Sequence, residues 1–169
     1  GFCYNSLLES FNVDRPQCPG YLLPRAVCSN TMAPTIIVRD GRLLAAFGTP
    51  GSSRIPSITA TVVSNLVDRG MGLAAAVAAP RILWGGTTNK RVSIEVVEPF
   101  TEADVAALES MGYEGMTVLR YPPPPDETMA NFGGVNVVGS DPSSGEYVGA
   151  VDPRRGGLAA GPRVVAPGG

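Results

Sequence analysis

Two backbone amide groups in the stretch FGTPGSSRI, residues 47–55, are the first candidates for chemistry. The stretch joins an apolar run typical of a strand to an apolar run with helical spacing that starts near Ile55. Backbone N–H groups at the start of a helix have no intrahelical acceptor and lie at the positive end of the helix dipole. The N–H groups of Gly51 and Ser52 would therefore suit an oxyanion that develops on a substrate carbonyl. A plain tight turn is the alternative, since most Gly-Pro-Gly sequences only reverse the chain.

The absence of histidine from the 169 residues restricts this chemistry. A Ser-His-Asp or Cys-His arrangement cannot form within the chain, and most zinc and haem sites are excluded with it. A general base must then be a carboxylate, an amine, a terminal amino group or a residue of another chain. Cys3, Cys18 and Cys28 have no metal-binding or redox spacing, so we expect free or buried thiols, with at most one disulfide bond. We expect neither a metal nor a cofactor.

Composition indicates a globular domain, with 44% hydrophobic and 17% charged residues. The net charge of −2, without a basic cluster, gives little support for nucleic-acid binding. No apolar run could span a bilayer and no basic region precedes an apolar one at the N-terminus, so we expect neither a membrane span nor a signal peptide. The cysteine pattern slightly favours the cytoplasm.

Hairpin and helix signals around the Gly51 stretch predict how it is positioned. Asp40-Gly41, between apolar runs at 35–38 and 42–47, predicts a β-hairpin. Apolar residues at helical spacing predict a helix from Ile55 to Arg69, which Gly70 stops. Further elements are expected as strands at 1–5, 91–97, 135–138 and 146–151, and as helices at 73–79 and from a Thr101 cap, with its Asp104 capping box, to Gly112. Antiparallel hairpins mixed with helices indicate an α+β fold rather than an alternating parallel one.

Three segments rich in proline or glycine predict irregular structure. Residues 14–30 contain three prolines and little periodicity, and we expect a loop. The run RYPPPPDET at 120–128 is typical of a stiff polyproline surface segment. The sequence RRGGLAAGPRVVAPGG ends the chain, so we place a domain at 1–155 and a Gly/Pro-rich tail at 156–169.

Four motifs, in order, resemble the small-subunit half of the γ-glutamyltranspeptidase family. They are SNTMAPTIIVRDGRLL at 29–44, the GTPGSSRI loop, APRI at 79–82 and VDPRR at 151–155. The resemblance runs from Gly1 to about Arg155. It implies part of a four-layer αββα sandwich of the N-terminal-nucleophile hydrolase type. It also implies autoprocessing of a precursor into a large and a small subunit, with the new N-terminal threonine as nucleophile and its α-amino group as base. That threonine precedes the segment matching Gly1, so a preceding segment and the large subunit are the expected partners.

The resemblance implies roles for several residues of this chain. Gly51 and Ser52 correspond to the oxyanion loop, where the family has a glycine at the second position. Asn30 and Thr31 correspond to paired serines that hold a substrate carboxylate, and both can still form hydrogen bonds. Met32 matches a methionine of the family and is expected to form part of a pocket wall.

The start of the chain departs from the family pattern, because GFCYNSLLESF stands for GILLNNQMDDF. The family's glutamine and second aspartate hold the substrate α-ammonium, and here they are Leu7 and Ser10. Neither carries a charge, and Glu9 could compensate only after a register shift. We therefore expect a diverged hydrolase whose substrate has an apolar or aromatic portion near Leu7. Such relatives cleave amide or C–C bonds of intermediates in antibiotic biosynthesis. A genuine γ-glutamyltransferase or glutathione hydrolase is the first alternative, and a non-catalytic structural subunit is the second.

The remaining polar candidates are expected to be structural. We expect ion pairs or carbonyl contacts for Arg54, Arg81 and Arg154, and a turn-fixing role for Asp152. Trp84 is expected to pack rather than to line an entrance.

Overall fold

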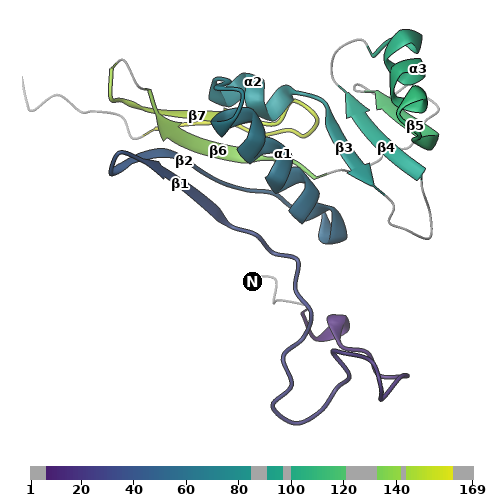
Figure 1. Ribbon diagram of the computed structural model, residues 1–169. Coiled ribbons are helices and arrows are strands. Elements are labelled where there is room, and N and C mark those ends of the chain that lie inside the picture. Colours follow the sequence, from purple (N-terminus) through teal and green to yellow (C-terminus); the bar gives the residue numbers. More distant parts are fainter. Residues whose placement is uncertain (1–6, 85–90, 97–99, 121–132, 142–143, 162–169) are drawn as a thin grey trace, which may run out of the picture. The chain divides into compact units, whose positions relative to one another are not determined.

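The computed structural model describes residues 7–84, 91–96, 100–120, 133–141 and 144–161 (Figure 1). The chain forms two compact units, residues 1–32 and 33–169. None of the described helices combines the length and the apolar character needed to cross a membrane.

The first unit contains little regular structure, as expected for residues 14–30. A 3-10 helix, η1, spans Leu7–Ser10, and a parallel bridge joins Asn12 to Tyr21. The side-chain amide oxygen of Asn12 accepts hydrogen bonds from the N–H groups of Asp14 and Arg15, at 3.0 and 2.8 Å. These two bonds stabilise a turn of the chain after Asn12. Cys18 and Cys28 are free thiols. The strand predicted at 1–5 lies outside the described residues.

A four-stranded antiparallel sheet in the second unit carries the predicted hairpin. Its order is β1-β2-β6-β7, with β1 at Thr35–Arg39, β2 at Arg42–Gly48, β6 at Asn136–Ser140 and β7 at Tyr147–Val151. Asp40 and Gly41 have φ angles of 52° and 75°, the positive pair that a two-residue hairpin turn requires. All four strands lie within two residues of their predicted bounds.

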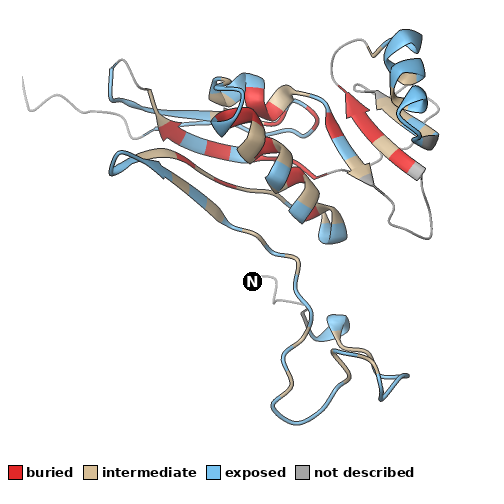
Figure 2. Cartoon of the chain, in the orientation of Figure 1, coloured by how far each residue is buried: buried red, intermediate tan, exposed pale blue. Residues whose placement is uncertain are grey.

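Two helices pack on one face of this sheet (Figures 1 and 2). Helix α1 spans Ile55–Val67 and α2 spans Leu73–Ala78. Their apolar residues form one core with alternate residues of the strands: Ala45, Phe47, Ile58, Val62, Leu66, Ala76, Val77, Val135 and Val137. Helix α1 ends two residues before the predicted Arg69, because the N–H groups of Asp68 and Arg69 both turn back to the Ser64 carbonyl. Gly70 has a φ of 63°, so the predicted stop is confirmed.

A second sheet was only partly predicted. Its order is β3-β4-β5, with β3 at Arg81–Trp84, β4 at Arg91–Val96 and β5 at Glu114–Arg120. The sequence analysis missed β3 and β5. Strand β4 pairs in parallel with β5, and α3 at Glu102–Ser110 makes the crossover that a parallel pair requires. The sequence analysis did not predict this parallel pair, and the predicted α+β class is confirmed.

Helix α3 begins as its sequence predicts. The Thr101 hydroxyl accepts from the Asp104 N–H at 3.2 Å, and the Asp104 carboxylate accepts from the Thr101 N–H at 2.8 Å. These two bonds form the expected capping box. Gly112, with a φ of 88°, follows the helix as the predicted stop. Leu108 packs on the small core of Val92, Ile94 and Val96.

Candidate active site

The predicted oxyanion loop connects the end of β2 to the start of α1. A short 3-10 helix, η2, spans Ser52–Arg54 and leads directly into α1 at Ile55. The Gly51 carbonyl accepts from the Arg54 N–H at 3.0 Å, and the Ser52 carbonyl accepts from the Ile55 N–H. The carbonyls of Gly51 and Ser52 are thus used inside the turn, and the helix starts where the sequence predicts.

The two candidate amides have unusual backbone conformations. Gly51 has φ 145° and ψ 8°, and Ser52 has a φ of 52°. Positive φ values are tolerated by glycine but strained by roughly 1–2 kcal/mol for a residue with a side chain. Gly51 is half-buried and Ser52 is exposed. Within the described part of the chain, no acceptor receives a hydrogen bond from either N–H group.

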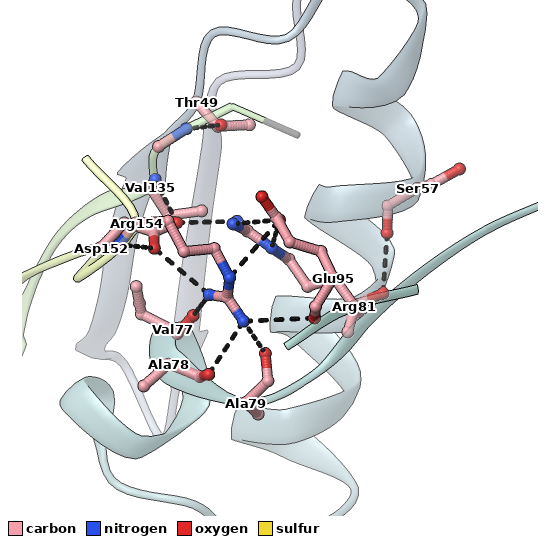
Figure 3. Close-up of polar contacts among 12 residues, drawn as sticks. Thr49, Ser57, Val77, Ala78, Ala79, Arg81, Glu95, Val135, Asp152 and Arg154 are labelled. Carbon is pink, nitrogen blue, oxygen red and sulfur yellow. Dashed lines mark hydrogen bonds and ion pairs between the residues drawn. The ribbon is translucent and has the colours of Figure 1, made fainter. Parts of the chain in front are cut away.

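A segment distant in the sequence, just before β6, contacts this loop. The Thr49 hydroxyl accepts from the Gly134 N–H at 3.1 Å (Figure 3). It also donates to the Pro50 carbonyl at 2.7 Å. Gly133 and Gly134 are buried just before β6. The sequence analysis missed these supports, because the contacts join residues 85 positions apart.

Four buried charged side chains form a cluster beside the helices (Figure 3). Arg81 pairs with Glu95 and with Asp152, both at 2.8 Å, and each of these side chains is at most 6% exposed. Arg154 pairs with Asp152 at 3.2 Å and with Glu95 at 3.4 Å. The two positive and two negative charges neutralise each other, which reduces the cost of removing them from water.

The Arg154 side chain also caps the C-terminal end of helix α2. Its guanidinium donates to the carbonyls of Val77, Ala78 and Ala79 at 3.0, 2.9 and 2.8 Å. These carbonyls lie at the negative end of the helix, where a cation is favourable. The ion pairs and carbonyl contacts expected for Arg81 and Arg154 are confirmed.

Asp152 connects the charge cluster to the neighbouring strand. Its carboxylate accepts from the Arg154 N–H at 3.0 Å, so the predicted turn-fixing role is confirmed. It also accepts from the Val135 N–H at 3.2 Å, and the Asp152 N–H donates to the Val135 carbonyl at 2.9 Å. Val135 directly follows the Gly133–Gly134 pair that supports the oxyanion loop.

Burial changes the proton affinity of two cluster members. Desolvation raises the pKa of Glu95 above its ordinary value of 4.5, against the opposing attraction of Arg81 and Arg154. Desolvation, followed by repulsion from Arg81, lowers the pKa of Arg154. Burial thus disfavours the charged forms of Glu95 and Arg154, and the ion pairs within the cluster oppose this effect.

The predicted substrate-binding residues all belong to the first unit, and the predicted oxyanion residues Gly51 and Ser52 belong to the second. The Asn30 side-chain oxygen accepts from the Met32 N–H at 2.8 Å, and Met32 is 56% exposed. Ser10 is exposed at the end of η1, while Leu7 begins it. A shared site between these residues and the oxyanion loop stays a prediction. Arg54 is half-buried, and the Trp84 side chain lies outside the described residues.

A protein-family model matches nearly all of this chain. The family described as Gamma-glutamyltranspeptidase matches residues 1–162. A glutathione hydrolase proenzyme of Pseudomonas sp. (strain A14) is 35% identical over 129 residues, which are 75% of this chain and 21% of the relative. The chain thus spans about a fifth of the length of this relative.

The chain shares its fold with solved structures. A gamma-glutamyltranspeptidase from Pseudomonas nitroreducens complexed with L-DON superimposes with a TM-score of 0.75 at 23% identity, over 96% of this chain and 83% of that one. A cephalosporin acylase from Bacillus halodurans gives a TM-score of 0.70 at 25% identity, over 88% of this chain and 25% of that one. The expected α+β fold of this hydrolase group is confirmed. With its motifs, its fold and a match over nearly all of its residues, the chain belongs to the γ-glutamyltranspeptidase family.

Proposed function

We propose that this chain is the small-subunit part of an acyl-transferring hydrolase of the γ-glutamyltranspeptidase type. A threonine outside this chain attacks the substrate carbonyl carbon through its hydroxyl oxygen, and its α-amino group takes the hydroxyl proton. The carbonyl oxygen becomes an oxyanion, which accepts hydrogen bonds from the N–H groups of Gly51 and Ser52. Collapse expels the leaving group, which takes up the proton. Water then repeats the sequence on the acyl-enzyme and releases the acid.

One observation carries this proposal. The N–H groups of Gly51 and Ser52 come just before η2 and α1, in positive-φ conformations, and no described residue accepts a hydrogen bond from them. Donors held in this way without an internal acceptor are suited to charge that appears only in a transition state. The family's known chemistry makes an oxyanion the fitting ligand.

We propose further that the acyl group differs from γ-glutamyl. Leu7 and Ser10 stand where the family holds the substrate ammonium, and they offer an apolar group and a neutral hydroxyl. Asn30 and Thr31 keep hydrogen-bonding groups for a carboxylate or carbonyl. The likeness to a cephalosporin acylase supports a non-glutamyl substrate, such as an intermediate of an antibiotic pathway. The glutathione hydrolase relative favours the alternative, a genuine γ-glutamyl enzyme.

We propose a large subunit as the partner of this chain. The relative from Pseudomonas sp. (strain A14) is a proenzyme, and this chain spans about a fifth of it. The sheet face opposite α1 and α2 carries exposed apolar residues, among them Ile36 and Val138, at 72% and 43% exposure. A second sheet layer would cover this face.

The substrate proposal is tested on the complete mature protein with two anilides, one γ-glutamyl and one with an apolar aliphatic acyl group. We expect turnover of the apolar anilide and little of the γ-glutamyl one. The double variant Leu7→Gln with Ser10→Asp restores the family's residues. We expect it to raise γ-glutamyl turnover at least about tenfold, which is the effect of gaining one charged contact with the substrate ammonium. Leu8→Gln, at an exposed neighbour, is the matched control. Robust γ-glutamyl turnover by the wild type would reject the diverged substrate in favour of the alternative.

A further inference from the structure

The turn of Thr49, Pro50 and Gly51 is held by contacts that a simple chain reversal does not need. The Thr49 hydroxyl lies between two backbone groups, donating to the Pro50 carbonyl at 2.7 Å and accepting from the Gly134 N–H at 3.1 Å. Thr49 is half-buried, and Gly134 is buried. One hydroxyl therefore ties the loop to the segment that enters β6.

The Pro50 carbonyl matters because it belongs to the same peptide plane as the Gly51 N–H. A trans peptide holds its C=O and N–H groups in one plane, pointing in opposite directions. A bond that fixes the Pro50 carbonyl therefore fixes the direction of the Gly51 N–H. That N–H is one of the two donors assigned to the oxyanion.

Gly133 leaves the space that this carbonyl occupies. A Cβ atom at Gly133 would lie 2.1 Å from the Pro50 carbonyl oxygen and 2.5 Å from the Thr49 hydroxyl oxygen. The φ of Gly133 is 96°, which also favours glycine. A side chain there would displace the carbonyl and rotate the peptide plane.

The following residues anchor the support. Val135 exchanges hydrogen bonds with Asp152, whose carboxylate pairs with Arg81. A Cβ at Gly134 would meet the Arg155 side chain at 2.8 Å, so this segment is closely packed on that side as well. These contacts fix the position of the Gly134 N–H, and its hydrogen bond to the Thr49 hydroxyl therefore fixes the loop.

We infer that Thr49 is a positioning residue for catalysis: its hydroxyl sets the Pro50–Gly51 peptide so that the Gly51 N–H faces the developing oxyanion. This inference rests on the proposed function. The strained φ of Ser52 explains why the Thr49 hydroxyl is needed. A strained loop relaxes to another conformation unless contacts with its surroundings stabilise it.

The test compares Thr49→Val, which removes the hydroxyl at similar volume, with Thr49→Ser, which keeps it. Both are made in the complete mature protein and assayed with the two anilides above. We expect Thr49→Val to lower kcat by about 10- to 100-fold, with KM changed less than about twofold, since a donor misplaced by a fraction of an ångström weakens the transition state most. Thr49→Ser is expected to restore kcat to within about threefold of the wild type.

Thr61→Val is the matched control, because the Thr61 hydroxyl donates to the Ser57 carbonyl of its own helix, α1, at 2.9 Å. We expect it to leave kcat unchanged. If Thr49→Val does not fold, Thr49→Ala replaces it. A wild-type protein that turns over an anilide while every folded hydroxyl-free variant keeps its kcat would overturn the inference alone. A correctly processed wild type that turns over neither anilide would overturn the proposed function and this inference together.

Discussion

Ser52 combines a side chain with a backbone conformation that favours glycine. Its φ of 52° lies in the left-handed region, and the residue is exposed. Replacing Ser52 with glycine removes the steric cost, while the unfolded chain gains entropy that offsets part of the benefit. We expect Ser52→Gly to stabilise the protein by at most about 1 kcal/mol. Thermal and urea unfolding of the complete protein measure this change.

Ser53→Gly is the control for this prediction. Ser53 lies in η2 without a positive φ, so glycine there only raises the entropy of the unfolded chain. We expect a loss of about 0.5–1 kcal/mol. Shifts of the same sign at both positions would contradict the assignment of strain to Ser52.

Single residues were predictable where their chemistry leaves few options. A buried arginine needs carboxylates or carbonyls, so the roles of Arg81 and Arg154 followed from their types. The partners themselves were not predictable, since Arg154 contacts carbonyls 75 to 77 positions earlier. Thr49 has an ordinary type, and its two contacts depend on a peptide plane and a distant glycine. These groups come together only in the folded structure, so the sequence alone does not reveal their contact.

At the scale of elements, local signals predicted structure where they were strong. The Asp40-Gly41 turn and the Thr101–Asp104 capping box are set by neighbouring residues, and both formed. Strand β5 was missed although Met116 and Val118 alternate, because Gly115 and three polar residues weaken the run. Strand β3 has four residues, and its extended conformation is stabilised by pairing with β4. Such strands are decided by tertiary pairing rather than by their own sequence.

The charge cluster joins β3, β4, the end of α2 and the segment after β7, and it gives these elements a shared dependence on pH. Because burial raises the pKa of Glu95 above 4.5, the folded protein holds this proton more tightly than the unfolded chain. The contribution of Glu95 to stability is complete below pH 4.5 and is lost as the pH rises through the raised pKa. We expect the difference in unfolding free energy between wild type and Glu95→Gln to fall over that range and to level off above it.

Urea unfolding of both proteins at a series of pH values tests this expectation, because the shared titration of other groups cancels in the difference. A difference that rises with pH below pH 4.5 and is level above it would mean that Arg81 and Arg154 outweigh the desolvation of the carboxylate. A flat difference would mean that Glu95 does not titrate differently in the folded and unfolded states.

At the scale of the whole molecule, one face of the four-stranded sheet remains apolar and exposed. Cross-strand pairing aligns Ile36 with Ala46, and Ala46 with Val138, in a row on the face away from the helical core. Ile36 is 72% exposed, whereas Ile37 beside it packs towards the core. An apolar row of this kind is typical of a surface that another layer covers. In the proposed function that layer comes from the large subunit.

Ile36→Lys tests whether this face is covered in the mature protein. A lysine ammonium buried there without a partner costs several kcal/mol, whereas on an open surface it costs little. We expect the variant to lose most of its association with the large subunit, measured by size-exclusion chromatography and by the intact masses of the co-purifying polypeptides. Ala60→Lys, at an exposed position of α1, is expected to assemble normally. Normal assembly of Ile36→Lys would show that the row faces solvent, and the large subunit would then have to bind elsewhere on this chain.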